Sequence, residues 1–151
     1  MPKTSAFEVD IVELIFDNTT LATIGDATGL VGSTVDGSLY VALLSGDPGA
    51  AGDLVNNELT VAEYGQYTRI AVGRAAGWEA NGSGGYQNAA AITYVVMSTG
   101  TGVTATHFAI CKESTIATDD AIYYGTLTAP LAISDGITPE FAAGALDVTE
   151  A

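Results

Sequence analysis

Short apolar runs separated by turn residues fill the chain after residue 20 and constrain its fold more than any other feature. The runs are rich in Val, Ile, Thr, Tyr and Ala, and clusters of Gly, Asn, Asp and Pro separate them. Such runs are typical of an antiparallel all-β domain. We expect six or seven strands, drawn from residues 39–44, 67–73, 78–80, 90–97, 105–112, 121–127, 131–133 and 141–148.

One helix is expected, and it precedes the strands. Ser5 and Glu8 form a capping-box pattern, in which each side chain satisfies an exposed backbone donor. The next apolar residues fall at i, i+4, i+7 and i+8 on one helix face; they are Phe7, Ile11, Leu14 and Ile15. Val9, Val12 and Phe16 widen this stripe, and residues 17–20 end it. So wide a stripe must be covered, either within its own domain or by a neighbouring chain, and both interpretations stay open here.

These patterns together predict a mainly β fold, an antiparallel β-sandwich of Greek-key or jelly-roll type with one N-terminal α-helix. A chain of 151 residues can bury the core of one domain. We therefore expect residues 1–20, the helix and its cap, to belong to the same unit as a β-sandwich domain of residues 21–151. Three stretches rich in Gly, Ser, Asp and Asn are expected to be loops; they are residues 25–37, 46–60 and 98–102.

The charge balance and the lack of long apolar runs argue against nucleic-acid and membrane partners. The chain has 18 acidic and 4 basic side chains, which gives a net charge of −14. Nucleic-acid binding depends on Lys and Arg that displace counterions, so we expect no nucleic-acid partner. No run approaches the 18 or so apolar residues of a membrane span, and the N-terminus lacks the apolar region of a secretory signal. We expect no membrane partner, and synthesis in the cytoplasm.

None of the candidate catalytic or cofactor patterns meets its chemical requirement. His107 and Cys111 lie four residues apart on an expected strand, roughly 13 Å between Cα atoms, which is too far for nucleophile activation. The Gly-rich residues 82–85 lack the Lys-Ser/Thr of a phosphate loop, and we expect them to form a hairpin loop. Loop carboxylates could bind calcium but lack EF-hand spacing; they are Asp26, Asp36, Asp47, Asp53, Asp119 and Asp120. We expect no enzyme, no catalytic, cofactor or metal residue, and no cofactor, with calcium at the acidic loops as the alternative.

Five aromatic residues lie close together in the sequence; they are Tyr64, Tyr67, Trp78, Tyr86 and Tyr94. Aromatic clusters form protein interfaces and sugar platforms as well as cores. We single out Tyr67, Trp78 and Tyr86 as a possible binding surface. A core position for the same residues is the alternative.

Several segments, taken in order, resemble a family of small tailed-bacteriophage virion proteins. The first are the capped helix ending at residues 14–19 and the strand of residues 39–43 leading to Asp47 and Pro48. The later ones are residues 67–69, Trp78 before an Asn-Gly turn, and residues 91–94, 106–110, 124–127 with Pro130, and 141–146. The chain departs from the expected pattern in a longer segment between Asn18 and Leu39 and in Cys111.

This resemblance implies a non-enzymatic structural protein of the virion, assembled in the host cytoplasm. Members of the family are described as tail-fibre-like, head-fibre or decoration proteins. We expect a symmetric surface subunit of the head, as a decoration or cement protein, or of the neck, collar or tail. The alternative is a tail-fibre or receptor-binding module that engages a host glycan or protein.

The resemblance also implies two kinds of partner. The first is the chain itself, as a homo-oligomer such as a trimer or hexamer, and the second is other virion proteins, such as the major capsid, neck or tail proteins. For the assembly contact we predict the helix stripe of Phe7, Ile11, Leu14 and Ile15. A lid on the protein's own sandwich is the competing interpretation of these four residues.

Overall fold

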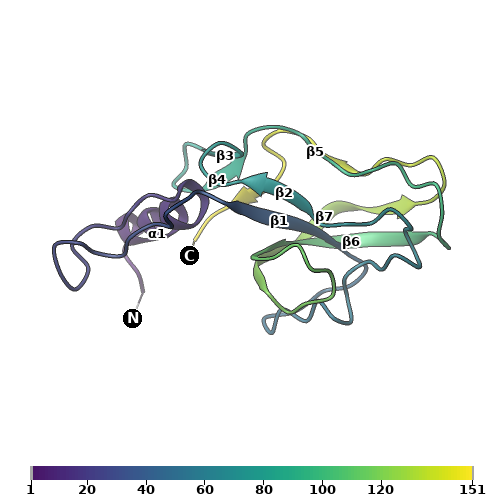
Figure 1. Cartoon of the computed structure of the whole chain (residues 1–151), viewed down its shortest axis with the longest axis horizontal. Coiled ribbons are helices and arrows are strands. Elements are labelled where there is room, and N and C mark those ends of the chain that lie inside the picture. The colour runs from purple at the N-terminus through teal and green to yellow at the C-terminus, as the bar shows by residue number, and fades with distance from the viewer. Residues whose placement is uncertain (1, 151) are drawn as a thin grey trace. The chain divides into compact units, whose positions relative to one another are not determined.

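A computed structural model of the chain describes residues 2–150 (Figure 1). Its contacts group these residues into two compact units, each assembled from segments that are separate in the sequence. Unit 1 consists of residues 2–38, 72–92 and 141–150, and unit 2 of residues 39–71 and 93–140. Within the described part of the chain, no helix is long and apolar enough to cross a membrane. The organisation into residues 1–20 and 21–151 stays a prediction.

The largest sheet has four strands in the order β2-β1-β6-β7. They are β1 (Ser38–Leu44), β2 (Ile70–Gly73), β6 (Val103–Cys111) and β7 (Ala121–Ile133). Strand β6 runs antiparallel to both β1 and β7 (Figure 1). The apolar sequence of β1 fits its central position, because residues 41–44 are all buried. Strand β7 ends the sheet.

The interior of unit 2 combines apolar packing with tyrosine hydroxyls that bond to β1. A fully buried cluster contains Ala42, Leu44, Leu54, Ala109 and Cys111. The rings of the buried Tyr67 and Tyr94 stack at a centroid distance of 6.3 Å. Their hydroxyls bond to the backbone of β1: Leu43 N–H donates to Tyr67 Oη (3.0 Å), and Tyr94 Oη donates to the Val41 carbonyl (2.9 Å). Strands β5 (Ile92–Thr93) and β8 (Glu140–Phe141) form a separate two-stranded sheet.

The helix of unit 1 begins one residue before the predicted position. Helix α1 spans Ser5–Val12, and the Thr4 side chain, not Ser5, accepts the capping bond from Phe7 N–H (3.4 Å). The predicted Ser5 cap is therefore wrong by one residue, because Ser5 already has helical geometry. A π-helical segment, η1 (Glu13–Asp17), continues α1 and ends at Asn18, whose positive φ of 59° stops the helix.

A small antiparallel sheet completes unit 1. It contains β3 (Trp78–Ala80), β4 (Tyr86–Asn88) and β9 (Asp147–Val148) in the order β3-β4-β9. The Gly-rich loop between β3 and β4 is a hairpin, as expected for residues 82–85. The side-chain oxygen of Asn81, Oδ1, accepts hydrogen bonds from the backbone N–H groups of Ser83 (2.8 Å) and Gly85 (3.0 Å). These bonds hold the turn closed.

The predicted class is confirmed: the chain is mainly β, with antiparallel sheets and one N-terminal helix. The three predicted loops contain no helix or strand. Several strand predictions need correction. The predicted strand of residues 67–73 begins only at Ile70, and that of residues 90–97 shrinks to β5.

Two further corrections concern where strands join or break. Residues 121–133 form one strand rather than two, because Pro130 falls at an irregularity on the sheet edge: Ala105 is opposite Leu131, whereas His107 is opposite Thr126. Residues 141–148 contain β8 and β9 with a turn between them, where Gly144 has a φ of +73°. Strand β4 was not predicted, and two of its three residues, Gln87 and Asn88, are polar.

Candidate assembly surfaces

The helical segment packs on its own unit through Val12 and Phe16, which are fully buried. The Phe16 ring lies edge-on to Trp78 at a centroid distance of 4.7 Å and stacks on Tyr86 at 5.9 Å. Aromatic pairs in such geometries stabilise beyond the area that they bury. The inner face of the helix is therefore structural, and it uses residues that only widened the predicted stripe.

The four predicted contact residues are less buried than this inner face. Phe7 is 36% exposed, and Ile11, Leu14 and Ile15 are half-buried. The structure thus brings all four onto one helical segment, α1 and η1. Their role as a contact with another chain stays a prediction. We call Phe7, Ile11, Leu14 and Ile15 the helix stripe.

A long loop of residues 21–37, here called the strap, follows the helix in the same unit. Leu21 and Leu30 close its tip by two backbone hydrogen bonds of 3.0 and 2.9 Å. The Asn18 side chain binds the Ser33 backbone, accepting from its N–H (2.6 Å) and donating to its carbonyl (2.9 Å). The strap also exposes apolar side chains; they are Leu30 (47%), Val31 (63%) and Val35 (74%). The C-terminal end of the helix and the strap are thus joined by hydrogen bonds, and the strap exposes apolar side chains.

Arg74 joins the helix to the strap. Its Nε donates to the Ile15 carbonyl (2.6 Å), and its guanidinium also donates to the Leu14 carbonyl and to Ser33 Oγ (3.0 Å). The last carbonyls of a helix lack partners within the helix, and a cation there is also favoured by the helix dipole. Arg74 therefore fixes the end of the helix stripe.

Strand β7 provides a second, chemically different surface in unit 2. It contains no Asp, Glu, Lys or Arg over its thirteen residues. Its position at the end of the sheet leaves backbone groups on its outer side without a strand neighbour in that sheet. Tyr124 is 44% exposed, and Gly125 lies under the ring of Phe108, where a Cβ would come within 2.9 Å of the ring. The first half of β7 is thus an uncharged edge, with one irregularity in its pairing to β6 between Ala121 and Tyr123.

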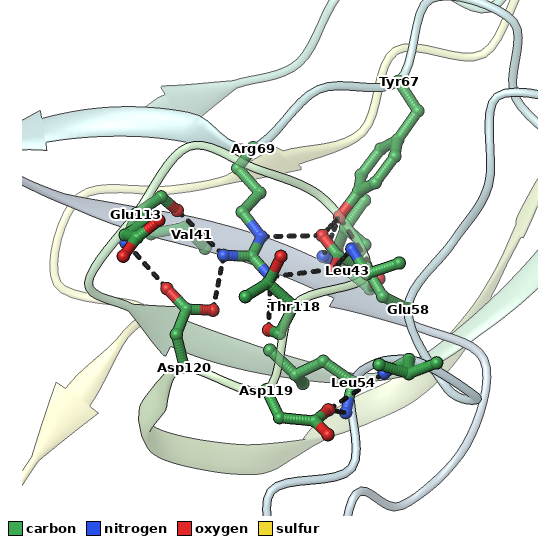
Figure 2. A network of polar contacts seen from close by, with 12 residues as sticks. Val41, Leu43, Leu54, Glu58, Tyr67, Arg69, Glu113, Thr118, Asp119 and Asp120 are labelled. Carbon is green, nitrogen blue, oxygen red and sulfur yellow. Dashed lines mark hydrogen bonds and ion pairs between the residues drawn. The ribbon is translucent and has the colours of Figure 1, made fainter.

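The chain enters β7 through a loop held by a buried arginine. Figure 2 shows Arg69 between two carboxylates: Glu58 accepts from Nε and Nη2 (both 2.9 Å), and Asp120 accepts from Nη1 (2.7 Å). The side chains of Arg69 and Glu58 are fully buried, and that of Asp120 is 5% exposed. Nη1 also donates to the Glu113 carbonyl (2.8 Å) and Nη2 to the Thr118 carbonyl (3.1 Å). All five guanidinium donors are therefore used.

The carboxylates of this network also order the backbone of residues 113–120. Asp120 accepts from Glu113 N–H (2.7 Å), and Glu58 accepts from Ala117 N–H (2.6 Å), where Ala117 has a positive φ of 54°. Desolvation lowers the pKa of Arg69, but the bonds to Glu58 and Asp120 outweigh it and hold the pKa above its ordinary value. The guanidinium thus stays charged, and the network holds the backbone of residues 113–120 in place.

The predicted binding surface lies in the interior instead. Tyr67 and Trp78 are each 2% exposed and Tyr86 is 8% exposed. Tyr67 belongs to unit 2, whereas Trp78 and Tyr86 belong to unit 1. Burial raises the pKa of Tyr67 and of Tyr86 above the usual tyrosine value. The structure therefore corrects this prediction in favour of the core interpretation that the sequence left open.

The acidic loop residues mostly bond to nearby backbone N–H groups. Asp26 accepts from Thr28 and Gly29, which lowers its pKa, and Asp119 accepts from Leu54 (2.8 Å) and Val55 (3.1 Å). Across residues 2–150, no three His, Cys, Asp or Glu side chains gather as a metal site would require. His107 contacts the Thr106 hydroxyl at 2.9 Å, and Cys111 is buried.

The sequence comparisons match one family to most of the chain. A family model described as "Podophage GP4 fiber I protein gp80" matches residues 17–149. A search of curated proteins found no match. The matched span contains the strap, every strand of both units and the Arg69 network. The chain belongs to this family of podophage fibre proteins and is a structural protein of the phage virion.

Proposed function

We propose that the chain is a non-enzymatic fibre subunit that joins the phage particle through its helix stripe and strap. The observation that carries this proposal is that one short helical segment has both buried and partly exposed apolar residues. Val12 and Phe16 complete the core of unit 1, while Phe7 is 36% exposed and three further apolar residues are half-buried. The strap adds Val31 and Val35, the most exposed large apolar side chains of the unit. Exposed apolar side chains on two segments that Arg74 and Asn18 join are the candidates for an interaction site in this unit.

The test compares apolar-to-polar variants in the two units of the chain. Phage lacking the gene are complemented with Ile11→Asn, or with Val61→Asn as the matched control, since Val61 is a 55% exposed valine of unit 2. We expect Ile11→Asn to fold and to disappear from purified particles, whereas Val61→Asn is incorporated normally. Normal incorporation of a folded Ile11→Asn protein would contradict the proposal. Deleting the helix is less informative, because the deletion also removes Val12 and Phe16 from the core.

Among the locations that the sequence left open, we propose a fibre at the neck or tail. The description of the matched family as a fibre protein supports this choice over head decoration. Quantitative mass spectrometry on separated heads and tails tests it. The chain is expected to follow the neck or tail at a low copy number. Copies comparable to the major capsid protein in the head fraction would restore the decoration role.

We also propose that copies of the chain associate along β7. A net charge of −14 makes copies repel one another, and an uncharged sheet edge is where they can approach at the lowest electrostatic cost. Added lysines are a common way to block an edge strand. Thr126→Lys on β7 is expected to shift sedimentation toward the monomer, whereas Thr104→Lys, on the exposed side of β6, leaves it unchanged. Equal sedimentation of both variants and the unmodified protein as oligomers would contradict this contact.

Receptor binding is the second candidate, and the fibre description of the family favours it. It cannot act through Tyr67, Trp78 and Tyr86 in this structure, because all three are buried. Trp78→Ala is therefore expected to lower the stability of the free protein. A Trp78→Ala protein that folds normally but loses adsorption to the host would restore these residues as a binding surface.

A further inference from the structure

We infer that the helix stripe and strap dock onto a cationic surface of a different virion protein, and not onto a second copy of this chain. This inference rests on the proposed docking function and specifies the chemistry of its partner. It starts from the distribution of charge around the apolar residues. Residues 4–37 contain no Lys, Arg or His. Their acidic residues are Glu8, Asp10, Glu13, Asp17, Asp26 and Asp36.

The carboxylates alternate with the apolar residues of the helix. Glu8 and Asp10 lie between Phe7 and Ile11 in the sequence, and Glu13 precedes Leu14. Asp10 is exposed, and Glu8 and Glu13 are partly exposed. An apolar stripe flanked by carboxylates is complementary to an apolar surface flanked by Lys or Arg, since complementary potentials favour encounter and like charges oppose it.

A second copy of the chain is a poor partner because its basic side chains are committed elsewhere. Lys3 pairs with Glu150, and Arg69 is buried between Glu58 and Asp120. Arg74 is bonded to the carbonyls of the helix end. Lys112 is the remaining basic residue of the sequence, and it is exposed in unit 2. The two exposed lysines, one of them already paired with Glu150, cannot balance six carboxylates of a facing copy.

The first measurement is carboxylate-to-lysine coupling by a carbodiimide on intact virions, followed by peptide mass spectrometry. This reaction joins Asp or Glu directly to Lys. We expect Glu8, Asp10 or Glu13 to be joined to lysines of another virion protein. The chain has only two lysines, Lys3 and Lys112, so a link to another copy would have to appear as a peptide that contains one of them. Coupling of the helix carboxylates to Lys112 of another copy would overturn the inference.

The second measurement uses charge reversal, so that a partner rich in arginine is also detected. The variant E8K/D10K/E13K is compared with E63K/E79K/D135K, which reverses the same number of charges outside residues 4–37. We expect incorporation of the first variant to fall by about tenfold or more relative to the control. The neutral variant E8Q/D10N/E13Q replaces the first if reversal prevents folding. A helix variant that is incorporated as well as its control would overturn the inference.

Ile11→Asn separates this inference from the function on which it rests. Loss of Ile11→Asn with normal incorporation of the charge variants means that the helix docks without a cationic partner, so only the inference fails. Normal incorporation of all of them means that the helix does not dock at all, so both fail.

Discussion

The helix of unit 1 and the entry to β7 in unit 2 use arginines five positions apart in the sequence for different purposes. Arg74 stays partly exposed and binds carbonyls at the end of an acidic helix, whereas Arg69 is buried and binds two carboxylates. Arg74 orders the end of a helix that carries acidic side chains, whereas Arg69 neutralises two buried carboxylates at the entry to a strand that carries no charge. This difference fits our two proposals for a chain of net charge −14, in which the acidic region binds a different protein and the uncharged β7 edge binds a second copy of the chain.

The largest effect is expected when the buried arginine is removed. Arg69→Met leaves Glu58 and Asp120 without their cation in the interior, which should lower the free energy of unfolding by about 3–5 kcal/mol. Urea denaturation measures the change. A loss below about 1 kcal/mol, the range of exposed pairs, would contradict the structural role of the network.

Substituting the two phenylalanines of the helical segment should lower the free energy of unfolding by very different amounts. Phe16→Ala removes ring contacts with Trp78 and Tyr86, and we expect a loss of about 3 kcal/mol in the free energy of unfolding. Phe7→Ala, on the more exposed side, should stay within about 0.5 kcal/mol. Thermal unfolding of both proteins checks the pair. Similar losses would mean that the helix stripe is a lid on its own unit.

Removing the partly exposed arginine should cost less than removing the buried one. Arg74→Met deletes hydrogen bonds to the carbonyls of Leu14 and Ile15, and the expected loss is about 1–2 kcal/mol because water can replace part of them. Hydrogen exchange should also rise in residues 14–18 and in the strap. An effect as large as that of Arg69→Met would remove the distinction between the two regions.

Cys111 reports whether the entry to β7 stays closed, because it lies opposite Ala121. Burial raises the pKa of Cys111 to about 12, with Glu58 and Asp120 adding to the rise and Arg69 opposing it. A pKa raised in the folded state gives stability that is present below the unfolded value of 9.0 and is lost as the pH rises toward 12.

We therefore expect no reaction of the folded thiol with a disulfide reagent near neutral pH. We also expect stability to decline from pH 9 upward, and less so in Cys111→Ala over the first unit above pH 9. Rapid labelling of the native protein would show that the β7 entry opens easily, and an unchanged decline in the variant would show that the pKa of Cys111 does not contribute to stability.

The sequence predicted the elements whose signals are local. The helix, the strands over residues 39–44 and 78–80, and the hairpin at residues 82–85 follow from short-range periodicity and turn residues. The prediction divided β7 into two strands because a proline usually ends a strand. Pro130 is tolerated inside β7 because the strand lies at the sheet edge, which only the tertiary structure reveals.

The candidate site shows the same limit. Periodicity placed Phe7, Ile11, Leu14 and Ile15 on one helix face, but it could not show that Val12 and Phe16 would be the buried residues. The Arg69 network was missed because Glu58 and Asp120 are 11 and 51 positions away. The sequence contained one signal for this network. Tyr67 and Arg69 lie two positions apart, and both belong to residues 67–69, which resemble the phage family.

A cryo-EM map of the intact particle tests the docking of the helix most directly. Our account predicts that α1 and the strap are covered by a different protein with Lys or Arg beside Glu8, Asp10 and Glu13, while β7 lies against a second copy of the chain. A map in which α1 and the strap face solvent, and the particle is held by other surfaces of the subunit, would contradict it.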